Sequence, residues 1–356
     1  MALQFGEAAP WPDLDTPGNP RFAFSVAAGR FVLVGCVPDA ESLALARAQI
    51  AAGRDRFDDM GLCAFLILRD EASIAAARDE VPGLRYARDR DGGVSRQFQF
   101  LEPDGAGSGW LLLDPTLRVI ATAPLDAAEG LFRSLAALPA PDDHAGVTMH
   151  APVLIVPRIF EPAVCRQLIA LYDRVGGTVS GVMREVDGRT VGMVDDFKSR
   201  RDADIEDQAL RRELRARIAR RLLPEVEKAL QFKATRMERY IVARYDAEEG
   251  GYFRPHRDNT TKGTVHRRFA VSINLDAEAF EGGDLRFPEF GRRTYRPPTG
   301  GAVVFSCSLL HEATPVTRGR RYAFLPFLYD EEGARVREAN LRFIDDAVPP
   351  PAGVQA

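Results

Sequence analysis

Hydrophobic positions in the first 140 residues form short apolar runs that alternate with amphipathic or alanine-rich segments. Runs of consecutive apolar residues predict buried strands, and apolar residues three or four positions apart predict helices. The expected elements are a strand over 31–36, a helix over 40–57, a strand over 62–68, a helix over 71–80, a hairpin over 110–121 and a helix over 126–137. Strands that alternate with helices and end in a hairpin indicate an α/β layer domain.

The pattern changes after residue 150. A strand over 151–156 precedes helices expected over 163–175 and 204–231, and we expect the polar segment 178–203 to form strands with mobile loops. From residue 239 onward the apolar runs are short and are separated by glycine and proline. The strands expected there cover 239–245, 252–256, 267–275, 284–287, 301–306 and 320–329. Many short strands of this kind indicate a sandwich or jelly roll.

Length and composition are those of a globular chain with two domains. A chain of 356 residues exceeds the usual size of one domain, and a Pro- and Asp-rich stretch over 141–150 predicts a linker between domains 1–140 and 151–356. A net charge of −4 gives no reason to expect nucleic acid or a membrane surface as partner. Because neither a bilayer-spanning run nor a signal peptide is evident, we expect a cytoplasmic protein.

Two histidines and one aspartate are the strongest candidates for chemistry. His256 and Asp258 stand two positions apart where an aromatic-rich strand runs into a loop, so their side chains point to the same side of the chain. His311 follows a second buried strand. Two imidazoles and one carboxylate that leave other positions open are the ligand set of non-haem Fe(II) oxygenases. We therefore expect these three residues to meet around one iron ion.

Arg321 lies in an apolar strand, where an unpaired guanidinium would be strongly unfavourable. A planar guanidinium binds a carboxylate through two parallel hydrogen bonds, so Arg321 indicates a carboxylate ligand such as the distal end of 2-oxoglutarate. A structural ion pair with Glu or Asp is the alternative. By strand alternation, Arg320 should face solvent on the opposite side. His266 is expected in an exposed loop. The adjacent Gly282 and Gly283 predict a tight turn with positive φ.

Residues from about 239 to 330 resemble the Fe(II)/2-oxoglutarate-dependent dioxygenases in the prolyl-4-hydroxylase-like branch. The segments that carry the resemblance are Arg244–Asp246, Gly251–Asp258, Ser272–Leu275, Glu281–Phe287 and His311–Ala323. The resemblance implies a double-stranded β-helix (jelly roll, cupin-like) with flanking helices, and iron held by His256, Asp258 and His311. It further implies that Arg321 holds 2-oxoglutarate, that Tyr245 and Asn274 line the same pocket, and that no other residue is catalytic.

The cofactors that this resemblance implies are Fe(II), 2-oxoglutarate as co-substrate, O2 and ascorbate, and the products are succinate, CO2 and a hydroxylated substrate. The substrate class stays open between peptidyl proline, an amino acid and another small molecule, and a homodimer is compatible with the sequence. Lys198, Arg200 and Arg201 are candidates for contacting an acidic or peptide substrate. A non-catalytic binding protein that uses the same pocket is a further alternative.

Residues 3–138 resemble the thioredoxin-like fold in its peroxiredoxin branch. The motifs are Gly6–Pro10, the strand into Cys36–Pro38, and Leu113–Pro115 before Val119–Ile120. The family's Thr-x-x-Cys pattern is missing, so we expect a degenerate scaffold without redox chemistry. The alternative function is a thiol peroxidase whose reactive group is Cys36, activated by a lowered thiol pKa.

Overall fold

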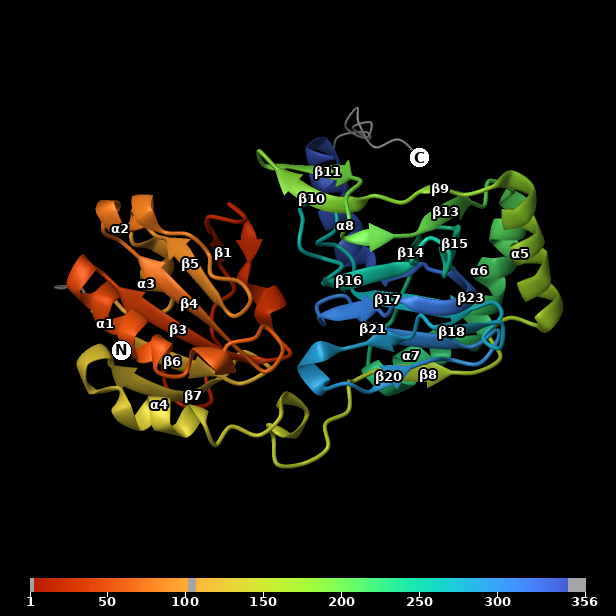
Figure 1. Cartoon of the computed structure of the whole chain (residues 1–356). Helices are drawn as coiled ribbons and strands as arrows, with labels where there is room; N and C mark the ends of the chain where they lie inside the picture. Colours follow the sequence, from red (N-terminus) through yellow and green to blue (C-terminus); the bar gives the residue numbers. More distant parts are fainter. Residues whose placement is uncertain (1–2, 102–106, 345–356) are drawn as a thin grey trace. The chain divides into compact units, whose positions relative to one another are not determined.

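The computed structural model describes residues 3–101 and 107–344 and divides the chain into two compact units (Figure 1). The first unit comprises Met1–Ala151 with Phe287–Arg292, and the second comprises Pro152–Arg286 with Arg293–Ala356. Within the described ranges, no helix combines the length and the apolar character that crossing a membrane would require.

The first unit is built on a five-stranded sheet in the order β5-β4-β3-β6-β7. Strands β3, β4 and β5 are parallel, and β6 and β7 extend the sheet in antiparallel pairs. Its elements are β1 (Asp13–Leu14), β2 (Phe22–Ala23), β3 (Phe31–Val37), α1 (Ala40–Ala51), β4 (Leu62–Leu68), α2 (Glu71–Ala76), β5 (Leu84–Arg88), α3 (Gly93–Gln97), β6 (Gly109–Leu113), β7 (Val119–Pro124) and α4 (Glu129–Leu135). The α/β layer expected from the sequence is confirmed.

Three helices of the first unit are shorter than predicted, and one of them is α4, which covers Glu129–Leu135 instead of 126–137. Helix α1 begins as expected, because the Asp39 carboxylate accepts a hydrogen bond of 2.8 Å from the Ser42 amide, but it ends at Ala51, two residues before Gly53. Helix α2 ends at Ala76, since Ala77 is already in an extended conformation. The prediction also missed strand β5 at the edge of the sheet, where charged residues interrupt the apolar run.

Cys36 lies near the end of β3 and is fully buried. Burial is the main reason why the pKa of its thiol rises to about 11. At neutral pH the group is therefore a thiol, whereas the nucleophile of a thiol peroxidase is a thiolate. This environment gives the Cys36 alternative no support.

The second unit is built from antiparallel strands in two main sheets. The larger sheet has the path β14-β24-β17-β23-β15-β13-β9, with β8, β18 and β21 paired to it, and the smaller sheet has the order β12-β16-β22-β19-β20. Its strands are β8 (Leu154–Val156), β9 (Thr178–Val179), β10 (Val182–Val186), β11 (Arg189–Met193), β12 (Lys198–Ser199), β13 (Arg201–Asp204), β14 (Arg236–Glu238), β15 (Ile241–Asp246), β16 (Tyr252–His256), β17 (Phe269–Asn274), β18 (Phe280–Gly282), β19 (Leu285–Arg286), β20 (Thr294–Tyr295), β21 (Ala302–Ser306), β22 (His311–Ala313), β23 (Val316–Phe324) and β24 (Phe327–Tyr329). Side chains from both sheets line one pocket between them, which is the arrangement of a double-stranded β-helix.

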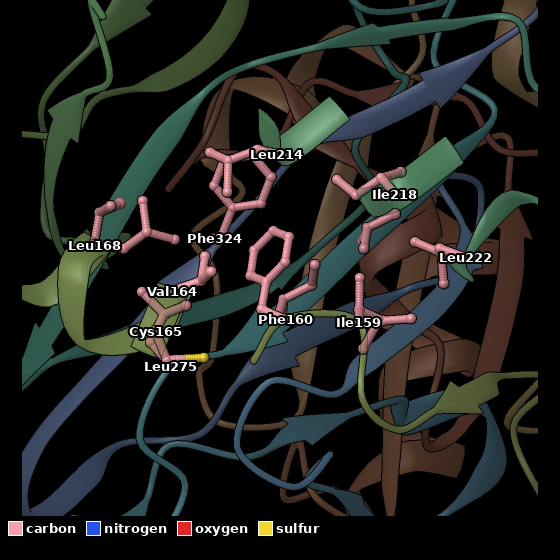
Figure 2. Close-up of a cluster of buried hydrophobic side chains, with 14 of the residues drawn as sticks. Ile159, Phe160, Val164, Cys165, Leu168, Leu214, Ile218, Leu222, Leu275 and Phe324 are labelled. Carbon is pink, nitrogen blue, oxygen red and sulfur yellow. The ribbon is translucent and has the colours of Figure 1, made fainter. Parts of the chain in front are cut away.

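Helices cover the outer face of the larger sheet. They are α5 (Pro162–Val175), α6 (Gln208–Arg221) and α7 (Leu223–Leu230), while α8 (Glu331–Asn340) follows the last strand. Leu168 of α5 and Leu214 of α6 pack with Phe324 of β23 in one buried cluster, which Figure 2 shows. Because side chains alternate along a strand, the residues next to Phe324 point to the inner face, where the pocket lies.

The prediction of a single helix over 204–231 is wrong. Residues up to Asp204 belong to β13, and the rest forms two helices that meet at Leu222 and Leu223. Pro224 lacks the amide hydrogen that a continuous helix would need, so it stands in the first turn of α7. The strand expected over 320–329 is likewise two strands, β23 and β24, which are separated by Leu325 and Pro326.

Candidate metal and co-substrate site

His256, Asp258 and His311 meet at the smaller sheet. His256 is the last residue of β16 and His311 the first of β22, and the two are directly paired across the antiparallel strands. Asp258 Oδ1 lies 3.5 Å from His256 Nε2, and Asp258 Oδ2 lies 3.3 Å from His311 Nε2. One potential ligand atom from each residue lies within 4.8 Å of the others. The structure thus brings together three residues that the sequence separates by up to 55 positions.

Backbone carbonyls orient both imidazoles. His256 Nδ1 lies 2.7 Å from the carbonyl oxygen of Arg254, and His311 Nδ1 lies 3.0 Å from that of Leu309. These contacts place the hydrogen on Nδ1 and leave the lone pair on Nε2, which is the atom nearest Asp258 in each ring. The Phe253 ring stacks on His256 with centroids 3.5 Å apart and holds that imidazole in place.

The electrostatic setting keeps His256 neutral. Burial and the neighbouring His311 lower the pKa of His256 to about 4. Burial alone would raise the pKa of Asp258, but the two imidazoles outweigh it and hold that pKa well below its usual range. Neutral imidazoles and an ionised carboxylate are the protonation states in which these groups bind a divalent metal. The donor set therefore fits Fe(II).

Arg321 lies on the inner face of β23 in the same pocket, whose empty volume is about 480 Å³. Its side chain is buried, and its Nη2 donates to Ser272 Oγ at 2.8 Å while its Nε donates to Asn274 Oδ1 at 3.3 Å. The Tyr245 ring lies 5.2 Å from the guanidinium carbon. Tyr245 and Arg321 line the pocket side by side, as the resemblance implies, whereas Asn274 contacts Arg321 but is not among the residues that line the pocket.

No carboxylate forms an ion pair with Arg321 among the described residues, so the structural ion pair considered from the sequence is not what holds it. Arg320 points the other way. Its side chain is 50% exposed and donates to Asp246 at 2.8 Å, which confirms the alternation expected from the strand pattern.

A glycine turn brings the chain close to Arg321. Gly282 and Gly283 have φ of +68° and +66°, which favour glycine. A Cβ on Gly282 would lie 2.1 Å from the Pro315 carbonyl oxygen, and one on Gly283 would lie 3.3 Å from Arg321 Cδ. The prediction of a tight turn with positive φ at this position is confirmed.

Arg200 and Arg239 also line the pocket, and Arg239 was not predicted. Arg200 was a candidate for the substrate side, but it is 5% exposed and forms two hydrogen bonds of 2.7 Å with Asp202. Its Nη1 donates to the Tyr245 hydroxyl at 3.3 Å. Arg201 instead donates to the Gly177 carbonyl, and the buried Lys198 donates to Ser180 Oγ.

The expectation of an exposed His266 is wrong. This residue is 1% exposed, and its Nε2 lies 3.0 Å from Glu238 Oε2. The loop that contains His266 is buried because α8 and β14 pack over it. Gly333 of α8 lies against the His266 backbone.

Residues 240–329 match the family described as the 2OG-Fe(II) oxygenase superfamily. The chain contains a 2OG-Fe(II) oxygenase domain. Its curated relatives include a PKHD-type hydroxylase of Cupriavidus metallidurans, 35% identical over 95 residues, and one of Pseudomonas fluorescens, 40% identical over 82 residues. These alignments cover 24% and 21% of this chain and 42% and 36% of the relatives, so the chain spans less than half the length of these relatives.

Solved structures similar to this chain include a prolyl-4-hydroxylase of Pseudomonas putida, with 22% identity and a TM-score of 0.38. That alignment covers 55% of this chain and all of the other. A prolyl hydroxylase of Trichoplax adhaerens, solved with a hypoxia inducible factor peptide, is 18% identical with a TM-score of 0.39, and the alignment covers 53% of this chain and 86% of the other.

Proposed function

We propose that this chain is a non-haem, Fe(II)- and 2-oxoglutarate-dependent hydroxylase whose iron is held by His256, Asp258 and His311. The observation that carries the proposal is the meeting of two imidazoles and one carboxylate in a single pocket with a buried arginine, inside the stretch that matches the superfamily. Together with 2-oxoglutarate and O2, bound Fe(II) supplies oxidation of a substrate C–H bond, with release of succinate and CO2.

The chain's own residues bind and orient the co-substrate. Arg321 offers a buried guanidinium to the distal carboxylate, since its two hydrogen bonds to Ser272 and Asn274 fix the side chain without neutralising its charge. Tyr245 packs beside that guanidinium and lines the pocket wall. The apolar side chains of Phe253 and Phe305 line the same pocket and limit access of water to the imidazoles.

In this proposal the first unit is an accessory domain with a thioredoxin-like fold. Its support is the strand order β5-β4-β3-β6-β7, in which three parallel strands are continued by an antiparallel pair, together with the sequence resemblance. We keep the boundaries 1–140 and 151–356 with a linker over 141–150. A cytoplasmic location, a homodimer and a role of ascorbate stay predictions.

The test combines metal binding with turnover. His256→Ala and Asp258→Ala should each abolish stoichiometric Fe(II) binding under nitrogen and also 2-oxoglutarate-dependent succinate release, because two remaining ligands hold a divalent ion weakly. A screen of prolyl peptides, free amino acids and small metabolites with Fe(II), 2-oxoglutarate and ascorbate would identify the substrate. His150→Ala is the matched control, because His150 is exposed. Full iron binding or turnover by either ligand variant would disprove the proposal.

A further inference from the structure

Arg239 extends the pocket wall away from Arg321. Along β15, positions 241, 243 and 245 share one face, and Tyr245 on that face pairs with Arg321. Arg239 stands two residues before the strand and lines the same pocket. The strand from Ile241 to Tyr245 alone spans roughly 13 Å at the usual rise per residue. Arg239 and Arg321 therefore lie toward opposite ends of one wall.

Arg200 connects these two ends. Its guanidinium lies 5.7 Å from the Tyr245 ring centre, and it shares the Asp202 carboxylate with Arg239. Arg200 uses both oxygens of Asp202, whereas Arg239 makes a single hydrogen bond of 3.0 Å from Nη2 to Oδ2. That is the one hydrogen bond of the Arg239 side chain within the described part of the chain, and its guanidinium also lies over the Phe327 ring at 5.7 Å.

The charges on this wall do not balance. One carboxylate, Asp202, faces two guanidiniums, and the other charged residues of the pocket lining are Asp258 and Arg321. When Fe(II) and 2-oxoglutarate are bound, as in the proposed function, the two negative charges of 2-oxoglutarate balance the two positive charges of iron. The positive charge of Arg321 balances the negative charge of Asp258. One positive charge is left on Arg239. Burial, and next the neighbouring Arg200, lower the pKa of Arg239 to about 10, so the group is still charged at neutral pH, and its side chain is 29% exposed.

The backbone of Arg239 gives an independent indication. Its φ is +64°, a conformation that disfavours residues with a Cβ, and it alone among the pocket-lining residues other than glycine has a positive φ. Strained backbone of this kind gathers at ligand clamps, where the surrounding structure holds it in place. Glycine would relieve the strain but would remove the guanidinium.

We propose that Arg239, held by the Arg200–Asp202 pair, binds a carboxylate of the substrate, so that the hydroxylated compound is an acid. The assignment of this anion to the substrate rests on the proposed function. The carboxylate belongs either to a free amino or organic acid or to an Asp or Glu side chain of a peptide. Both kinds of carboxylate present two oxygens in one plane, which a guanidinium can bind through two parallel hydrogen bonds.

The experiment measures binding to the full chain loaded with Fe(II) and 2-oxoglutarate under nitrogen, by calorimetry. One set of probes pairs L-amino acids with their α-amides. The other pairs N-acetylated, C-amidated peptides that contain Asp or Glu with their Asn or Gln counterparts. The first set detects a small acid and the second an acidic peptide. We expect at least one acid to bind about 10- to 100-fold more tightly than its amide, as for a charged hydrogen-bond pair.

Arg239→Gly and Arg239→Ala should abolish this preference equally, although the glycine variant should be the more stable of the two on thermal unfolding because of the positive φ. If Arg239 had only a structural role, the glycine variant would keep more of the preference for acids than the alanine variant, because it is the more stable of the two. Arg239→Lys should retain part of the preference for acids, since lysine keeps the positive charge but lacks the two parallel N–H donors of the guanidinium. Arg318→Ala is the control, because Arg318 is 74% exposed and pairs with Glu281.

Two outcomes would overturn the inference. In one, acids and amides bind alike or no probe binds; in the other, the acid preference survives in Arg239→Gly. Binding of Fe(II) and 2-oxoglutarate is measured first in each variant and should be unchanged within about twofold. If the unmodified chain binds neither, the proposed function itself fails, which distinguishes that failure from failure of the Arg239 assignment.

Discussion

At Arg321, the alternation of one strand places a guanidinium on the inner face while its neighbour Arg320 faces solvent. Burial lowers the pKa of Arg321, and the nearby Tyr245 acts in the opposite direction. Neutral partners, Ser272 and Asn274, fix the side chain and leave its charge for a ligand. A charge buried in this way is unfavourable until an anion binds, which explains why a dicarboxylate co-substrate suits the pocket.

Replacing Arg321 should therefore weaken the co-substrate specifically. We expect Arg321→Ala to raise the KM for 2-oxoglutarate about 10- to 100-fold and Arg321→Lys to raise it less, because lysine keeps the charge without the two-pronged geometry. Succinate release measured against 2-oxoglutarate concentration gives both values. Arg320→Ala, one residue away on the exposed face, should leave KM unchanged. An unaltered KM in Arg321→Ala would refute the role of this side chain.

Among the elements, β14 is short but connects three parts of the second unit. Its last residue, Glu238, accepts hydrogen bonds from His266 at 3.0 Å, from Arg267 at 2.7 Å and from Arg337 of α8 at 3.2 Å. Burial alone would raise the pKa of Glu238, but His266 and Arg267 outweigh it and lower that pKa to about 2. The segment between β16 and β17 is thereby joined to α8 through one carboxylate.

This cluster should make stability depend on pH. Because the folded pKa of Glu238 lies below its usual value of about 4.5, the stabilisation is complete above pH 4.5 and is lost as the pH falls toward 2. We expect Glu238→Gln to reduce the free energy of unfolding at pH 7 by about 3 kcal/mol and by much less near pH 3. Urea unfolding at both pH values measures this difference.

Glu332→Gln makes the same change of charge on an exposed position of α8 and should have little effect on the unfolding free energy. A loss in Glu238→Gln that stays the same at pH 3 and pH 7 would show that the carboxylate charge is not what stabilises the cluster.

For the whole molecule, the two units differ in the groups they offer for chemistry. The second unit presents two imidazoles and one carboxylate, the groups that could hold a metal ion, together with buried arginines in one pocket, whereas Cys36 of the first unit is enclosed in the middle of its sheet. Cys36 Sγ lies 3.5 Å from Ser95 Oγ, and burial keeps the thiol protonated. The chemistry of the chain is therefore expected in the second unit.

Cys36→Ala should leave 2-oxoglutarate-dependent succinate release unchanged, and the unmodified chain without iron should not consume hydrogen peroxide. In the native protein, alkylation of Cys36 at pH 8 should be slow and should become fast only on unfolding, because a pKa of about 11 leaves almost no thiolate. Cys63→Ala is the matched control, since Cys63 is equally buried with its pKa raised to about 11. Rapid, Cys36-dependent peroxide consumption would contradict this assignment of roles.

Local patterns in the sequence were sufficient for several parts of this protein. Two-residue alternation placed His256 with Asp258 and separated Arg321 from Arg320, and apolar runs predicted long strands such as β3, β4 and β17, because these features depend on near neighbours in the chain. The pairing of Gly282 with Gly283 likewise predicted positive φ. The meeting of His311 with the other two residues was expected from the motif and not from any local rule.

Only the tertiary structure decided which distant side chains share the pocket wall and which loops are buried. Arg200 lies beside Tyr245 because β13 pairs with β15, and the Asp202 carboxylate joins Arg200 to Arg239. His266 is buried because α8 packs over its loop. The sequence signal for these residues is that of ordinary charged surface positions. Their surroundings depend on strand register and on helix packing between segments that are far apart in the chain. A pattern among neighbouring residues contains no information on such long-range contacts.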